Sequence, residues 1–260
     1  MNSHLFEVLA GVVAGLGGGV LSGLFGIGGG IVLVPLLALV LHLDQHKAQG
    51  VTLAAMLLPI GLPAVLHYRR KGVRILWPLV GMIVVGFLFG VFAGSELANH
   101  IPERPLRYGF VLFLVFVAVR MIGQKDGGAA RPGAMDRPRS DYWIPGLVIG
   151  AASGVASGLL GIGGGILIIP MVVWWLGFSQ QEAQVASLAV MLPPIGLPGV
   201  LVYAQAQNGL PWLILCGVAI GFATGAYIGA QGATRMKGPG LRLAFAGLVV
   251  ATAVLMALKR

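Results

Sequence analysis

The chain has 260 residues, of which 57% are hydrophobic and only 10% are charged, whereas a soluble domain carries about 25% charged residues. It contains one cysteine and 17 Lys and Arg against 8 Asp and Glu, a formal net charge of +9. This composition excludes an ordinary soluble domain, a disordered chain and a disulfide scaffold, and it indicates a polytopic membrane protein.

Long apolar segments, separated by the few charged residues, predict an all-α protein, since a bilayer-spanning helix needs about 20 apolar residues. The uncharged stretch between Glu7 and Asp44 would be about 54 Å long as one helix, too long for one straight crossing, so it should break at Gly26–Gly30. The predicted segments are Leu5–Phe25, Ile31–Leu43, Ala48–Leu66, Ile75–Ser95, Pro105–Met121, Tyr142–Leu160, Ile166–Phe178, Ala183–Tyr203, Leu213–Gln231 and Leu241–Leu258. The two short ones, Ile31–Leu43 and Ile166–Phe178, are predicted to be half-helices or re-entrant pieces.

The chain repeats itself with a shift of 135 residues. Ser22–Ile31 matches Ser157–Ile166, and Met56–Pro63 matches Met191–Pro198, without a gap. The pairs Ala48-Gln49 and Ala183-Gln184, and Tyr68 and Tyr203, keep the same register. We therefore predict a transmembrane repeat at 1–122, a linker at 123–141 and a second transmembrane repeat at 142–260.

The charged loops predict which way each half faces, because cytoplasmic loops carry the excess of Lys and Arg. His67–Arg74, the linker and the loop from Arg235 to Arg242 are basic and should be cytoplasmic. Ala204–Pro211, the counterpart of His67–Arg74, has no charge and should be external. This predicts two inverted repeats of about four or five segments each, a pattern typical of secondary transporters. The positive charge then reports topology and contact with anionic lipid rather than nucleic-acid binding.

Glycines at four-residue spacing form ladders, which allow close contact between helices. The ladders are Gly11, Gly15, Gly19 and Gly23; Gly86, Gly90 and Gly94; Gly146, Gly150, Gly154 and Gly158; and Gly217, Gly221, Gly225 and Gly229. We interpret them as packing faces. They suit an interface inside one chain or a homodimer, and the sequence leaves both open.

Two clusters of consecutive glycines differ from these ladders, since they predict unwound backbone with N–H groups beside the N-terminus of a following helix. Such donors can bind an anion, and neutral hydroxyls near them could help to hold an oxyanion and release it. The candidate substrate-binding residues are Ser22, Gly26, Gly28, Gly29, Gly30, Thr52, Ser157, Gly161, Gly163, Gly164, Gly165 and Ser187. The alternatives are tight turns without ligand contact and hydroxyls that bond their own helix.

Prolines interrupt the third apolar segment of each half, Ala48–Leu66 and Ala183–Tyr203. These prolines, with two others and two glutamines, are candidate hinge or site-lining residues. They are Pro35, Gln49, Pro59, Pro63, Pro170, Gln184, Pro194 and Pro198. As alternatives, the prolines form static kinks and the glutamines, near segment ends, are interfacial. Charged residues such as Lys47, Arg120 and Glu182 are expected at segment ends. No nucleophile–base arrangement or metal-ligand spacing appears, so we expect no catalytic residue, no metal and no cofactor.

The duplicated G-I-G-G-G-I-x-x-x-P, followed by A-Q and P-I-G-L-P, resembles the TauE/SafE family of membrane permeases over essentially the whole chain. The resemblance implies transport of sulfur oxyanions, sulfite or organosulfonates, often as export across the bacterial inner membrane. Together with the inverted repeats, the resemblance predicts a multi-pass secondary transporter that exports its substrate. The predicted partners are a small anion and the lipid bilayer. The alternatives are a transporter of another anion such as a carboxylate, a transporter of a metal ion, and a non-transport membrane assembly component. The lack of a set of intramembrane acidic, Cys and His ligands in the sequence pattern weighs against a metal ion.

Overall fold

The computed structural model describes residues 3–25, 30–58, 62–70, 72–123, 135, 138–233 and 239–258, and all regular elements within them are helical. This confirms the predicted all-α class. The first half contains α1 (Ser3–Phe25), α2 (Gly30–Val40), α3 (Gln45–Ala55), α4 (Leu62–Arg70), α5 (Trp77–His100) and α6 (Glu103–Gly123). The second half contains the 3-10 turn η1 (Arg139–Tyr142), α7 (Trp143–Leu160), α8 (Gly165–Met171), the π-helix η2 (Val172–Leu176), α9 (Gln180–Val190), α10 (Leu197–Ala206), α11 (Trp212–Ala233) and α12 (Pro239–Leu258).

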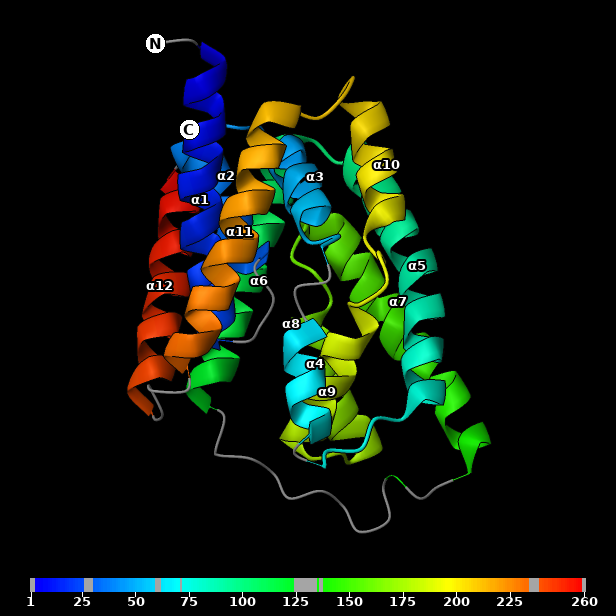
Figure 1. Cartoon of the computed structure of the whole chain (residues 1–260). Coiled ribbons are helices and arrows are strands. Elements are labelled where there is room, and N and C mark those ends of the chain that lie inside the picture. The colour runs from blue at the N-terminus through cyan, green and yellow to red at the C-terminus, as the bar shows by residue number, and fades with distance from the viewer. Residues whose placement is uncertain are drawn as a thin grey trace.

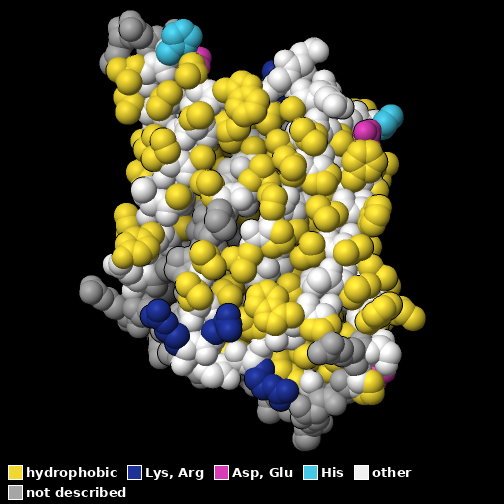
Figure 2. Space-filling model, turned by 45° about the vertical axis from the view of Figure 1, so that its right-hand side comes forward, with side chains coloured by type: hydrophobic (Ala, Val, Ile, Leu, Met, Phe, Trp, Pro, Cys, Tyr) yellow, Lys and Arg dark blue, Asp and Glu magenta, His cyan; other side chains and the backbone are white. Residues whose placement is uncertain are grey.

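Four helices in the described part of the chain are long and apolar enough to cross a membrane. They span His4–Gly23, Trp77–His100, Ser140–Leu160 and Trp212–Gly229. Figure 2 shows hydrophobic side chains covering most of the visible face, while the visible Lys and Arg gather mainly near its lower end. This distribution is the one expected of a multi-pass membrane protein.

The long uncharged stretch near the N-terminus forms two helices, α1 and α2, as predicted. Gly30 is the first residue of α2, whereas Gly26–Gly29 lie outside the described residues. In the second half, α7 ends at Leu160 and is followed by Gly161, whose φ of +68° is the left-handed conformation that glycine adopts readily. The predicted short segments correspond to α2 and to α8 with η2, both too short for a full crossing.

The third apolar segment of each half, predicted as one interrupted segment, forms two separate short helices. Ala48–Leu66 corresponds to α3 and α4, and Ala183–Tyr203 corresponds to α9 and α10. Pro198 lies in the first turn of α10, where a proline removes no intrahelical hydrogen bond. In Figure 1, α3 and α10 lie in the upper half of the molecule, and α4 and α9 lie in the lower half. We use "upper" and "lower" in this sense below.

The glycine ladders pack helices of one half against helices of the other. The α1 ladder lies on the α11 backbone, so that a Cβ at Gly11, Gly15 or Gly19 would collide with the carbonyl oxygens of Ile214, Val218 and Phe222. The α11 ladder lies reciprocally on the carbonyls of Val8, Val12 and Leu16. The same exchange joins α5 to α7, with Gly86, Gly90 and Gly94 on Leu147, Ala151 and Val155, and Gly150, Gly154 and Gly158 on Ile83, Phe87 and Val91. The packing interpretation of these ladders is therefore confirmed.

The buried core follows the same mixed pairing. One cluster joins α1, α2, α3 and α6 to α11 and α12, with Leu33, Phe110 and Val218 among its buried members. A second joins α5 to α7, α8 and α9, with Phe87 and Ile149 among its buried members. The two halves therefore share their cores rather than folding as separate bodies, and the short helices lie between the long pairs (Figure 1).

Candidate functional site

The backbone between α7 and α8 forms a buried turn with unused hydrogen-bond donors. Gly161 and Gly163 have φ values of +68° and +73°, and the residues from Gly161 to Gly165 are all buried. Within the described residues, the N–H groups from Ile162 to Ile166 donate to no protein acceptor. Unsatisfied N–H groups are costly in a membrane interior, so this turn is a natural position for a ligand that accepts hydrogen bonds.

The first glycine cluster approaches this turn at the one member that the structure describes. A Cβ at Gly30 would meet the backbone carbon and oxygen of Ile162 at 2.5 Å, so the start of α2 lies directly against the turn. The predicted sites Gly26, Gly28 and Gly29 lie outside the described residues. The candidate site thus includes backbone from both halves of the chain.

The face of α3 that carries Thr52 lies against the turn. A Cβ at Gly161 would lie 2.8 Å from Gln49 Cα, and one at Gly163 would lie 2.5 Å from Met56 Cε. Thr52 lies between Gln49 and Met56 on the same helix face, three residues from one and four from the other. Its hydroxyl is fully buried and has no hydrogen-bond partner in the described structure. Thr52 therefore adds an unused hydroxyl to the unused backbone donors.

The other predicted hydroxyls differ in their surroundings. Ser157, in the last turn of α7, is also fully buried with an unpartnered Oγ. Ser187 on α9 is buried, and Ser22 on α1 is half-buried. The Gly161–Gly165 turn therefore follows directly on the last turn of α7 with Ser157 and lies against the α3 face that carries Thr52, whereas no such contact within the described residues is found for the surroundings of Ser22.

Gln49 is buried within α3 and holds the end of α7, contrary to the alternative that it is interfacial. Its Nε2 donates to the carbonyl of Leu159 at 2.9 Å. The Tyr203 hydroxyl lies 2.6 Å from the carbonyl oxygen of Gly158 and 2.8 Å from Oε1 of Gln49, two acceptors for its single proton. The last carbonyls of a helix have no partner inside that helix, so Gln49 and Tyr203 together satisfy the carbonyls that precede the glycine turn.

The equivalent residues of the other half also meet. The Tyr68 hydroxyl donates to Oε1 of Gln184 at 3.2 Å. Each pair joins one half of the chain to the other, since Gln49 bonds Tyr203 and Gln184 bonds Tyr68. Sequence reasoning assigned no role to either tyrosine, although both occupy matching positions in the duplication, which was the available signal.

The candidate hinge prolines lie at breaks as well as inside helices. Pro35 is buried within α2, and Pro170 lies within α8 shortly before the π-helix η2. Pro194 is exposed in the turn between α9 and α10, and Pro63 is the second residue of α4. Pro59 lies outside the described residues. No group of three or more His, Cys, Asp or Glu able to hold a metal occurs in the part of the chain that the structure describes.

Comparison with known families matches residues 10–256 to the family described as "Sulfite exporter TauE/SafE". The chain belongs to the TauE/SafE family. This TauE/SafE protein is 28% identical over 218 residues to a "Probable membrane transporter protein" of Bacillus subtilis, covering 82% of this chain and 85% of the relative. A Haemophilus influenzae protein of the same description is 27% identical to this chain, and the match covers 98% of each of the two chains.

A third relative, from Methanocaldococcus jannaschii, is also described as a probable membrane transporter protein. It is 28% identical, with 76% of this chain and 72% of the relative covered. No solved structure matches this TauE/SafE protein. The family and the apolar helices together identify a multi-pass membrane transporter.

Proposed function

We propose that the protein is a secondary transporter that carries a small sulfur oxyanion, sulfite or an organosulfonate, out of the cell across the bacterial inner membrane. The substrate binds at the turn from Gly161 to Gly165. The observation that carries this proposal is the concentration at one place of donors that make no hydrogen bond within the described residues. They are the N–H groups from Ile162 to Ile166 and the hydroxyls of Thr52 and Ser157.

The chemistry of these donors suits a transported oxyanion. An oxyanion has several acceptor oxygens, and hydrogen bonds to a charged acceptor are about twice as strong as neutral ones. Because backbone N–H and hydroxyl groups are uncharged, they can hold an anion without the strength of a buried ion pair. An anion bound here can therefore be released again, as transport requires.

Alternating access between two inverted repeats is the proposed mechanism. Its support is that equivalent helices lie in opposite halves of the molecule (Figure 1). Helix α3 lies in the upper half and its equivalent α9 in the lower half, and α10 lies in the upper half and its equivalent α4 in the lower half. Equivalent pairs, α1 with α11 and α7 with α5, also make equivalent glycine contacts. In such transporters the site lies near the midplane at the interface between the repeats, and the Gly30–Ile162 contact is an interface of this kind.

Export is favoured by the membrane potential. Moving one negative charge out of a negative interior gains about 2.3 kcal/mol per 100 mV. An outward path for an anion therefore needs no coupling carboxylate within the membrane. The family description, which names sulfite export, supports the same direction.

Flux through reconstituted vesicles tests the proposal. The purified full chain is placed in liposomes, and efflux of sulfite, an organosulfonate and a carboxylate is measured, each against empty liposomes. Saturable sulfur-oxyanion flux is expected. Saturable flux of the carboxylate alone would transfer the proposal to that substrate, and no flux of any solute would favour a non-transport membrane component.

Two hydroxyl substitutions connect the flux to the site. Thr52→Val and Ser157→Ala should each lower the flux at least tenfold, since removing a hydrogen bond to a charged group costs about 1.5–3 kcal/mol. Thr224→Val is the matched control, because its hydroxyl bonds the carbonyls of Ile220 and Gly221 in its own helix. Equal flux in all three variants would show that the substrate does not bind at this turn.

A further inference from the structure

A buried arginine lies outside the glycine turn and forms no ion pair with any residue that the structure describes. Arg107, on α6, is 6% exposed, and its Nε has no hydrogen-bond partner. Within the described residues its guanidinium forms no ion pair, and its one aromatic contact is the Tyr108 ring at 6.0 Å. Buried charges are normally paired, and an ionisable residue inside a membrane bundle marks a functional site more often than a structural one. Segment boundaries alone did not distinguish Arg107 from charges at helix ends.

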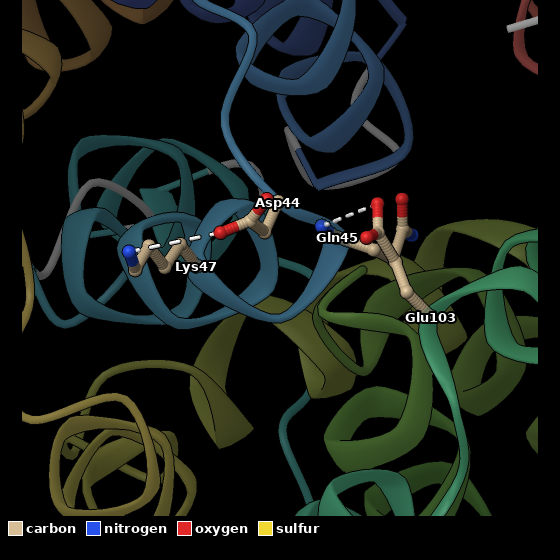
Figure 3. Close-up of polar contacts among 4 residues, drawn as sticks. All are labelled: Asp44, Gln45, Lys47 and Glu103. Atoms are coloured by element: carbon tan, nitrogen blue, oxygen red, sulfur yellow. Dashed lines mark hydrogen bonds and ion pairs between the residues drawn. The ribbon is translucent and has the colours of Figure 1, made fainter. Parts of the chain in front are cut away.

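Arg107 lies where α6 packs on α3, at the upper end of the molecule. Glu103, one turn earlier on α6, accepts a hydrogen bond from the backbone N–H of Gln45 at 3.4 Å (Figure 3). Phe110, one turn later, belongs to the same buried cluster as Ala48. Residues three and four apart share a helix face, so Arg107 shares the face of α6 that carries Glu103 and Phe110.

Gln45 adds a second buried polar group without a partner. Its side chain is 1% exposed, and neither Nε2 nor Oε1 makes a hydrogen bond. Figure 3 shows the side chains of Gln45 and Glu103 next to one another at the start of α3. Although the Glu103 carboxylate lies beside Gln45, the Gln45 amide and the Nε of Arg107 donate to no acceptor within the described residues, so both retain hydrogen-bond donors for a ligand.

From this position a polar stripe follows α3 to the glycine turn. Gln45, Gln49, Thr52 and Met56 recur at intervals of four, three and four residues, which places them on one face. The stretch from Gln45 to Thr52 covers about 10 Å along the helix axis. All three polar members are buried, and the stripe ends where Met56 meets Gly163.

The duplication repeats both features. The stripe recurs on α9 as Gln180, Gln184, Ser187 and Met191, and Arg107 corresponds to Arg242. Among the charged residues before Gly123, Arg107 alone has a counterpart of the same charge 135 residues later. Met191 also reaches Gly163, where a Cβ would lie 3.6 Å from its Cε, so the two stripes converge at one glycine.

We propose that Arg107 and Gln45 bind an oxyanion at the upper mouth of a path that follows the α3 stripe to the glycine turn. This inference rests on the proposed function for the identity of the path, whereas anion binding at Arg107 can be measured without transport. Arg107 supplies the positive charge that selects anions, and the uncharged stripe leads from Arg107 to the glycine turn. The equivalent stripe on α9 forms the other half of the path.

Equilibrium binding of sulfate and sulfite to the purified full chain tests the site. Arg107→Gln should weaken the affinity at least tenfold, Arg107→Lys should lose less because it keeps the charge, and Gln45→Met should lose less than Arg107→Gln. Arg104→Gln is the matched control, since Arg104 is exposed on the same turn of α6. An affinity of Arg107→Gln equal to that of Arg104→Gln would overturn the proposal.

The phosphate of an anionic lipid has the same chemistry as a free oxyanion, so the binding assay has a second arm. Delipidated protein is titrated with sulfate and, separately, with short-chain phosphatidylglycerol. Arg107-dependent binding of sulfate supports the path, whereas Arg107-dependent binding of the lipid alone overturns it. Size-exclusion profiles check folding. Should Arg107→Gln not fold, the Arg107→Lys and Gln45→Met affinities decide, and both equal to wild type would overturn the proposal.

Flux separates this inference from the function on which it rests. In liposomes, Arg107→Gln should reduce anion efflux at least tenfold at low substrate and leave Arg104→Gln unaffected. Sulfate binding that depends on Arg107, without flux of any anion in the wild type, would overturn the proposed transport and keep the binding site. Flux that is unchanged in Arg107→Gln would overturn the path.

Discussion

Gly154→Ala tests whether the glycine ladders set the separation of the paired helices. In the structure, a Cβ at Gly154 on α7 would lie 2.5 Å from the carbonyl oxygen of Phe87 and 2.8 Å from the N of Val91 on α5. To bring the methyl from 2.5 Å to the 3.4 Å at which ordinary contact begins, the two backbones must separate by about 0.9 Å. A gap of 0.5–1 Å forfeits about a quarter to a half of the attraction of each atom pair.

The expected cost of this separation is about 1–3 kcal/mol, the usual range for overpacking. At about 2–4 °C per kcal/mol for a chain of 150–250 residues, the apparent Tm in detergent should fall by about 2–12 °C. The assay is fluorescence-monitored thermal unfolding of the purified full chain.

Gly81→Ala is the control for the same substitution without the contact. Gly81 lies on α5, is exposed, and has no atom within 4 Å of its ideal Cβ position. Alanine is favoured over glycine in a helix by about 0.5–1 kcal/mol, so this variant should match or exceed the wild-type Tm. Equal Tm values for Gly154→Ala and Gly81→Ala would refute the argument that close backbone contact holds the pair together.

Two further predictions concern the candidate site. Tyr203→Phe should lower the free energy of unfolding by about 1–2 kcal/mol, because it leaves the buried carbonyl of Gly158 without its partner. The control Tyr227→Phe, at an exposed position, should leave the stability unchanged. Equal thermal unfolding of the two variants would contradict the role of the Tyr203 hydroxyl. Gly163→Ala should abolish flux, because the φ of +73° at this residue is combined with close contact to Met56. The control Gly72→Ala has a similar φ of +78° but open space around it, so it should cost only the backbone strain of about 1–2 kcal/mol and keep transport. Equal flux in the two variants would show that the contact with Met56 is unimportant.

Several features of the fold followed from local patterns. Long apolar stretches predicted the helical segments, and the length of the stretch between Glu7 and Asp44 required the break that separates α1 from α2. The four-residue glycine spacing predicted close packing faces. These predictions succeeded because helix formation and face composition depend on residues near one another in the chain.

Other features needed contacts between distant residues. The third segment of each half was predicted as one interrupted piece, yet α3 and α4 are separate helices that pack on different partners. Gln49 was assigned a hinge or lining position or an interfacial one, and its bond to the α7 carbonyl across 110 residues shows a helix-capping role. Arg107 looked like any charge near a segment end, because burial and the lack of an acidic partner are not local properties.

By itself, the sequence determined the membrane class, the duplication, the helical segments and the faces that could pack closely. All of these follow from composition, periodicity and a shift of 135 residues. Only the tertiary structure decided which faces pair, with α1 on α11 and α7 on α5. It also decided which buried polar groups find no partner among the described residues, including those of Thr52, Ser157 and Gln45 and the Nε of Arg107. The reason is physical: a glycine face accepts any close-fitting helix, and a buried polar group is satisfied or not only by neighbours that folding brings from elsewhere in the chain.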